Sequence, residues 1–244
     1  MYTAHIYIPR MLLLILGLQE RFCGICAQIG NRPSEKIAQG VILSAVVLYD
    51  NSYSTPSVMP ETQLDDAGDG SFENLMKAEF SELFTKVENR LNNLSVMIKI
   101  YLESSSKDPN IAVIFKGMAM SLDGPKTLEN LINHEKTINA TNDTVLFFFI
   151  NNEILQENTR GDQVPNHLRE ISTWKTFCTK DRSAAVVKYT PKTLDFRSTL
   201  DATAYILGSR RGWRPHPRDR ASMNETFRHC HKDTSVSKEE LEVP

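Results

Sequence analysis

Apolar residues occur in blocks whose spacing predicts strands and helices. Residues 41–48 form a continuous, largely β-branched run, which is typical of a strand buried on both faces. Residues 71–92 place apolar side chains at helical spacing, with Glu, Lys and Arg on the opposite side, and predict a long amphipathic helix. Residues 144–150 are almost wholly apolar and include three consecutive phenylalanines, so they predict a central strand.

Shorter patterns predict the remaining elements. We expect strands over residues 95–102, 111–118 and 183–189, a helix over residues 127–137, and a last helix from about Asp195 that ends before Pro215. Strands that alternate with helices predict an α/β fold with one mainly parallel sheet. At 244 residues and 41% hydrophobic, the chain is long and apolar enough for one globular domain.

The two ends of the chain have a different character from the middle. An apolar run at residues 11–18 follows Arg10 and precedes small residues near Ala27, which predicts a secretory signal peptide over residues 1–27. A short buried strand or core helix is the alternative for this run, which is too short for a membrane span of about 20 residues. We expect a linker over residues 28–40, the domain over residues 41–232, and a charged, disordered tail over residues 233–244.

Glycosylation sequons and cysteine usage also favour an extracellular protein. The four sequons have the acceptors Asn93, Asn139, Asn142 and Asn224. Removal of the signal peptide would take two of the four cysteines with it and leave Cys178 and Cys230, an even pair that suggests one disulfide. We therefore expect a secreted, disulfide-bonded glycoprotein, and a monomer.

Charge gives little indication of a partner outside one local cluster. The formal net charge of -2 provides no basic field, so we do not expect a nucleic-acid partner. Near the C-terminus, five arginines surround Trp213 and form a candidate patch for a heparin-like polyanion: Arg210, Arg211, Arg214, Arg218 and Arg220. The alternative is a solvated and partly disordered stretch.

Several phrases of the sequence occur in an order that resembles a known family. They are Leu48-Tyr49-Asp50, residues 87–94, Asp108-Pro109-Asn110-Ile111, Cys178 ahead of residues 183–187, and Phe227-Arg228-His229-Cys230. Over about residues 41–232, this order resembles the reprolysin (adamalysin) branch of the metzincin zinc metalloproteases, notably forms from arthropod saliva and venom. The resemblance implies a metzincin-like catalytic domain with a mixed, mainly parallel twisted sheet and packed helices. It also implies a Cys178–Cys230 disulfide and a substrate-binding edge strand near residues 171–174.

The zinc-binding phrase of that family is degenerate in this chain. In the family, Ala-Thr-Ala is followed by HExxHxxGxxHD, in which three histidines bind zinc and the Glu is the general base. Here Ala-Thr-Ala is kept at residues 202–204. The resemblance places the following residues at the family's positions: Tyr205 at the first histidine, Ile206 at the base, Ser209 at the second histidine, Gly212 at the glycine and Pro215 at the third histidine, with His216 one position late.

These replacements predict that the chain neither binds zinc nor catalyses hydrolysis. Loss of two ligands would weaken zinc binding by about ten-thousand-fold, and an isoleucine cannot carry a proton. We expect a pseudoprotease that binds an extracellular peptide, protein or polyanion and needs no cofactor. The first alternative is an active zinc metalloendopeptidase that cleaves extracellular host proteins. The second is a non-functional product of a disturbed reading frame around residues 205–220.

Three minor features concern metal sites. His216 is a weak candidate ligand, which could be joined by neighbours of the C-terminal cysteine: His229, Cys230 and His231. Met223 is the candidate for the methionine turn that the resemblance implies. The acidic run at residues 65–70 has oxygen ligands but not the spacing of a calcium loop, so we expect a solvated linker there.

Overall fold

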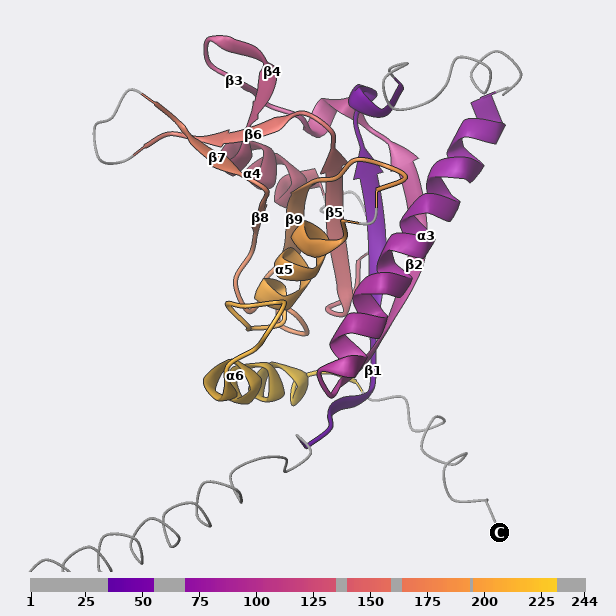
Figure 1. Ribbon diagram of the computed structural model, residues 1–244, viewed down its shortest axis with the longest axis vertical. Coiled ribbons are helices and arrows are strands. Elements are labelled where there is room, and N and C mark those ends of the chain that lie inside the picture. Colours follow the sequence, from indigo (N-terminus) through magenta and orange to yellow (C-terminus); the bar gives the residue numbers. More distant parts are fainter. Residues whose placement is uncertain (1–34, 55–68, 135–139, 159–163, 194, 232–244) are drawn as a thin grey trace, which may run out of the picture. The chain divides into compact units, whose positions relative to one another are not determined.

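A sheet of five strands carries the candidate site. The computed structural model describes residues 35–54, 69–134, 140–158, 164–193 and 195–231 (Figure 1). The strand order is β2-β1-β5-β9-β8. These strands are β1 (Ile37–Tyr49), β2 (Val96–Lys107), β5 (Thr144–Ile150), β8 (Glu170–Ser172) and β9 (Ser183–Lys188). All neighbouring pairs are parallel except β8 with β9, so the predicted α/β class with a mainly parallel sheet is confirmed.

Helices cover both faces of this sheet, which explains the continuous apolar runs in its central strands. On one face, α3 (Asp69–Asn93), α5 (Arg197–Ile206) and α6 (Pro217–Phe227) pack with the odd-numbered residues of β5. On the other face, α4 (Gly124–His134) packs with the even-numbered residues of β5. The rings of Phe80 on α3 and Phe149 on β5 stack with centroids 4.9 Å apart. A strand buried on both faces needs no polar alternation.

Strands before and after α4 in the chain form a second sheet. Its order is β3-β4-β6-β7, formed by β3 (Ile114–Phe115), β4 (Met118–Asp123), β6 (Glu153–Gln156) and β7 (Asn166–Leu168). Two short 3-10 helices complete the elements, η1 (Asn51–Ser54) and η2 (Pro109–Ile111). The chain passes from β7 to β8 through Arg169 alone, so the second sheet leads directly into the edge of the first.

Several boundaries differ from those that the sequence predicts. β1 begins at Ile37, inside the expected linker, and α4 begins at Gly124 rather than at residue 127. The single strand predicted over residues 111–118 is wrong, because Gly117 turns the chain at φ +84° and produces the β3–β4 hairpin. The predicted signal peptide, the C-terminal tail, Asn139 and residues 65–68 lie outside the described residues.

The disulfide expected from cysteine usage and from the resemblance is present. Cys178 and Cys230 are bonded, with their Cα atoms 5.0 Å apart and a sequence separation of 52. The bond joins the segment that follows β8 to the segment that follows α6. A loop of this length corresponds to a stabilisation of about 4 kcal/mol in the chain-entropy account of disulfides.

Candidate functional site

One face of α5 is polar and exposed, and it forms a wall of the candidate site. Arg197, Asp201 and Tyr205 follow one another at intervals of four residues, so the helix presents them in one row. The Arg197 Nε lies 3.9 Å from a carboxylate oxygen of Asp201, and the Tyr205 side chain is 37% exposed. The opposite side of α5 is buried in the core. The row therefore points away from the sheet.

The helix ends one turn too early to continue this row. Gly208, at φ +99°, follows the C-cap residue Leu207; the Gly208 N–H donates to the Tyr205 carbonyl at 3.0 Å, and the Ser209 N–H donates to the Ala204 carbonyl at 2.7 Å. This pair of bonds is a Schellman C-terminal motif, which stops the helix. Ser209 is consequently turned inward and is fully buried, with its hydroxyl donating to the Arg211 carbonyl at 3.0 Å.

This ending corrects the prediction of one helix from about Asp195 to Pro215. Two zinc-binding histidines of the family type must share one helical face, one turn apart. Tyr205 is the last exposed position of α5, whereas Ser209 lies beyond the helix and inside the protein. These two positions do not converge on a common point, so the site lacks the geometry of a zinc site as well as its ligands.

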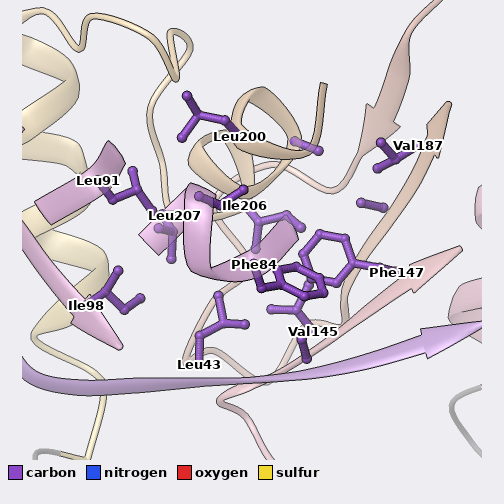
Figure 2. Packing of buried hydrophobic residues seen from close by; sticks show 14 of the residues in the cluster. Leu43, Phe84, Leu91, Ile98, Val145, Phe147, Val187, Leu200, Ile206 and Leu207 are labelled. Atoms are coloured by element: carbon purple, nitrogen blue, oxygen red, sulfur yellow. The ribbon is translucent and has the colours of Figure 1, made fainter. Parts of the chain in front are cut away.

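The position that the resemblance gives to the general base is part of the core. Ile206 is fully buried and packs in the same cluster as Leu43 of β1 and Phe84 of α3 (Figure 2). Leu207 lies beside it and is also fully buried (Figure 2). A carboxylate at this position would lose its water without gaining a partner, so an apolar side chain suits the position.

Residues 209–216, the return loop, fold back along α5. The Gly212 N–H donates to the Asp201 carboxylate at 3.1 Å, and a Cβ on Gly212 would lie only 2.9 Å from both the Asp201 Cα and the Leu200 carbonyl oxygen. Only glycine fits such a close approach of two backbones. The loop is therefore held against the helix, while its arginines stay exposed, as the solvated alternative expects.

Trp213 anchors the return loop to α3. The guanidinium of Arg90 lies 4.3 Å from the centre of the Trp213 ring, and the same side chain donates to the Trp213 carbonyl at 2.7 Å. Phe196 contacts the ring from the start of α5, with centroids 6.1 Å apart. A cation–π contact combined with a charge-assisted hydrogen bond fixes the loop from its middle.

His216 caps a helix instead of lying in a cluster of metal ligands. Its Nδ1 accepts a hydrogen bond from the Arg218 N–H at 3.2 Å, and its own N–H donates to the Asp219 carboxylate at 2.9 Å. These reciprocal bonds form a capping box at the start of α6. Pro215 directly precedes this cap and has no ligand atom in its side chain. Met223 is buried within α6, so it does not lie in a turn.

The donor set near α5 does not fit the zinc ion that the resemblance implies. A phenol, a buried hydroxyl and a proline stand where three imidazoles are required. In the described ranges, no three side chains of His, Cys, Asp or Glu gather closely enough to hold a metal ion. His229 is exposed, and Cys230 is taken up by the disulfide.

β8 provides the opposite wall of the candidate site, and its outer edge is open. The Thr173 N–H donates to Ala184 of the β9 segment at 3.0 Å, and the Arg169 carbonyl accepts from Lys188 at 2.9 Å. Because backbone groups alternate along an antiparallel strand, those of Glu170 and Ser172 point away from β9. In the described part of the chain no strand pairs with this outer edge.

Between these walls lies the edge groove, a cavity of about 550 Å³. It is lined by β8 (Glu170, Ile171, Ser172), by α5 (Arg197, Asp201, Tyr205), by the return loop (Arg210, Arg211, Trp213, Arg214), and at one end by Gln156 and Leu168. The return loop therefore brings three of the five arginines of the predicted polyanion patch into the groove. The other two lie on α6, where the Arg220 guanidinium donates to the Leu94 carbonyl and Arg218 is exposed.

The pKa of Glu170, a carboxyl group that lines the groove, is strongly raised. Burial raises the pKa of Glu170 to about 7, and the negative charge of Asp201 adds to this effect, while Arg169 opposes it. Near neutral pH, Glu170 is therefore about half protonated, and its protonated carboxyl is a hydrogen-bond donor beside the open backbone edge.

Tyr205, which lines the groove, packs against a second exposed aromatic side chain, Trp174. Trp174 and Tyr205 pack with ring centroids 4.5 Å apart, and the Arg210 guanidinium lies 5.6 Å from the centre of the Trp174 ring. The Lys175 N–H donates to the Tyr205 carbonyl at 3.2 Å, which fixes the segment after β8 on the end of α5. The tyrosine at the first histidine position is thus packed against the segment that follows β8.

Three predicted glycosylation acceptors fall within the described residues. Asn93 at the end of α3, Asn142 before β5 and Asn224 on α6 are all exposed. In two of these sequons the hydroxyl residue is buried, namely Thr144 and Thr226. The structure therefore leaves the three asparagine side chains accessible, and their glycosylation stays a prediction.

The sequence did not indicate several residues that line the groove or hold its return loop in place. Asp201 and Glu170 lie in short elements without a motif, and the role of Trp213 depends on Arg90, which is 123 positions away. Gly212 was the one available indication, because a glycine in a charged stretch marks a turn or a close backbone approach.

The helices of the described ranges include none that is long and apolar enough to cross a membrane. In comparisons with known proteins, no protein-family model and no curated protein matches this chain. The geometry of the edge groove therefore carries the functional interpretation.

Proposed function

We propose that this chain is a secreted, catalytically inactive relative of the reprolysin-type metalloproteases that binds an extended peptide along the outer edge of β8. One observation carries this proposal: the backbone groups of Glu170 and Ser172 point into a groove of about 550 Å³ with no strand beside them. An extended peptide adds to such an edge through main-chain hydrogen bonds. The resemblance expects the substrate-binding edge at residues 171–174, which overlaps β8.

The loss of catalysis is supported by the end of α5. The resemblance requires two histidines on one helical face and a glutamate directly after the first of them, but Ile206 is buried in the core and Ser209 is turned inward after the helix has stopped. Reversion of these residues to the family pattern would place a carboxylate in the core, not beside a metal. The proposed protein therefore binds peptides without hydrolysing them.

An extracellular location is supported by the Cys178–Cys230 disulfide, because such bonds persist in oxidising compartments. The exposed acceptors Asn93, Asn142 and Asn224 agree with it.

A binding assay tests the proposal. The probe is a fluorescent pool of dodecapeptides of random sequence, and the variant is Ser172→Pro, which removes the outward N–H while sparing the bonds to β9. We expect the pool to bind the wild-type protein and the Ser172→Ala control, and to bind Ser172→Pro at least about tenfold more weakly. Equal binding to Ser172→Pro would show that the β8 edge is not the site.

A metal assay tests the inactive part of the proposal. Purified protein should contain zinc far below one ion per chain, and it should leave casein intact with or without chelator. Stoichiometric zinc together with chelator-sensitive cleavage of casein would overturn this part and would favour an active metalloendopeptidase.

A further inference from the structure

The edge groove has a strong excess of positive charge on one side. Arg210, Arg211 and Arg214 of the return loop and Arg197 of α5 line it, against the carboxyl groups of Glu170 and Asp201. The Asp201 carboxylate already has partners within the protein, because it lies 3.9 Å from Arg197 and accepts a hydrogen bond from the Gly212 N–H. At neutral pH, Glu170 carries only part of a negative charge. The positive charge of the return loop is therefore not balanced by carboxylates of the groove.

Within the return loop, two arginines are available to a ligand. Arg210 lies against the Trp174 ring. Arg211 and Arg214 are exposed, and neither forms an ion pair with any residue in the part of the chain that the structure describes. Both line the same groove as Ser172. Their backbone is held by Gly212 and Trp213, so both side chains extend from a fixed stretch of chain that borders the groove.

We propose that the edge groove selects an acidic extended peptide, whose backbone pairs with β8 and whose alternate carboxylates bind Arg211 and Arg214. This inference rests on the proposed function and adds the chemical class of its ligand. Side chains of an extended strand alternate between two faces, so every second residue of the bound peptide points to the same side. Guanidinium groups bind carboxylates with two parallel hydrogen bonds, which makes Arg a selective partner for Asp and Glu.

The geometry favours an acidic peptide over a heparin-like polyanion. A polysaccharide would contact a continuous basic surface, but Arg220 is turned to the Leu94 carbonyl and Arg218 lies on α6, outside the groove. The basic residues of the groove stand instead beside unpaired main-chain donors and acceptors, which a polysaccharide cannot pair in the manner of a strand. The groove therefore offers backbone hydrogen bonds and positively charged side chains to the same ligand.

A pair of matched peptides tests this inference. The probes are a labelled dodecapeptide that alternates Thr with Glu and its analogue that alternates Thr with Gln. We expect the Glu peptide to bind at least about tenfold more tightly at low ionic strength, and the difference to shrink as salt is added. The double variant Arg211→Gln/Arg214→Gln should remove the difference.

The control variant has the same change in net charge on another surface. Arg218→Gln/Arg228→Gln alters two exposed arginines of the α6 region and should leave the preference for the Glu peptide intact. Circular dichroism and thermal unfolding of both double variants verify that they fold. Equal loss in the two double variants would overturn the inference, because it would mean that net charge and not the groove determines binding.

The remaining outcomes separate this inference from the proposed function. If both peptides bind the wild type equally and Ser172→Pro abolishes both, the edge binds peptides but the acidic preference is wrong. If neither peptide binds and the random pool also fails to bind, both proposals are wrong. If a heparin hexasaccharide binds, and does so equally to Ser172→Pro, while the peptides do not, the groove is a polyanion site and the inference is overturned.

Discussion

The two edges of the five-stranded sheet are treated in opposite ways. At the β2 edge, the protein seals its own backbone: the Ile100 N–H donates to the Glu88 carboxylate of α3 at 2.7 Å. Exposed charged and polar side chains follow along the same strand, among them Lys99, Glu103 and Lys107. At the β8 edge, the backbone groups of Glu170 and Ser172 point into a groove and have no strand beside them.

This difference indicates that the open β8 edge is a local feature and not a general property of the sheet. Unpaired strand edges promote aggregation, and proteins commonly cover or charge them. The long β2 shows both devices, one amide bonded by Glu88 and several exposed charged side chains. The open β8 is only three residues long and is bordered by the arginines of the return loop, so it is open to a single extended chain but unsuited to sheet growth.

The largest expected loss of stability follows from removing the disulfide that holds the segment after β8. The double variant Cys178→Ser/Cys230→Ser frees the segment after β8 from the end of α6. We expect the free energy of unfolding to fall by about 4 kcal/mol in urea titrations, because the unfolded chain regains the entropy of an open loop. An unchanged stability would mean that this bond does not hold the two segments together in solution.

Substitution of Gly212 should cause the next largest loss of stability. In Gly212→Ala, the new methyl group meets the Asp201 Cα and the Leu200 carbonyl at 2.9 Å. We expect about 1 to 3 kcal/mol of destabilisation and a detached return loop. Thermal unfolding measures the first effect, and tryptophan fluorescence measures the second. A fully stable Gly212→Ala would contradict the close packing of the loop.

The raised pKa of Glu170 gives a pH-dependent effect of intermediate size. Because the pKa is about 7 in the folded protein and about 4.5 in the unfolded chain, the neutral carboxyl favours folding below pH 4.5, and this contribution is lost as the pH rises through 7. After a reduction for the water that reaches the side chain, the loss is about 2 kcal/mol. Urea titrations of Glu170→Gln should lack this decrease between pH 5 and 8. A wild-type decrease that the variant shares would assign it to other groups.

The smallest effect is expected at the sealed edge. Glu88→Ala leaves the Ile100 N–H without its partner, whereas Glu88→Gln retains an acceptor oxygen. We expect Glu88→Ala to lose about 1 kcal/mol and Glu88→Gln to lose less. The Ile100 amide should also exchange faster with solvent in Glu88→Ala alone. If both variants behave alike, the seal at β2 is not due to this hydrogen bond.

The sequence predicts the central elements well because their patterns are strong. β5 occupies residues 144–150 as predicted, and α3 lies within a few residues of its predicted range. The elements that build the site are harder to predict, since β6, β7 and β8 are three or four residues long and carry no clear alternation. α6 is rich in polar residues, so its helical period is weak.

The site residues divide in the same way. The resemblance directs attention to the end of α5 and to the edge near residue 171, and the disulfide pair is confirmed. The early stop at Gly208 is a backbone property that a comparison of ligand positions does not show. The fixation of the return loop depends on Arg90 and Asp201, which only the folded chain brings to Trp213 and Gly212.

Amide hydrogen exchange, measured residue by residue with and without the alternating Thr-Glu dodecapeptide, tests the central claim most directly. In the free protein, we expect the amide of Ile100 to be protected and those of Glu170 and Ser172 to exchange rapidly. With peptide, Glu170 and Ser172 should become protected while Ile100 does not change. Protection of Glu170 and Ser172 in the free protein, or no change in either on adding a peptide that binds, would contradict an open β8 edge that receives an extended chain.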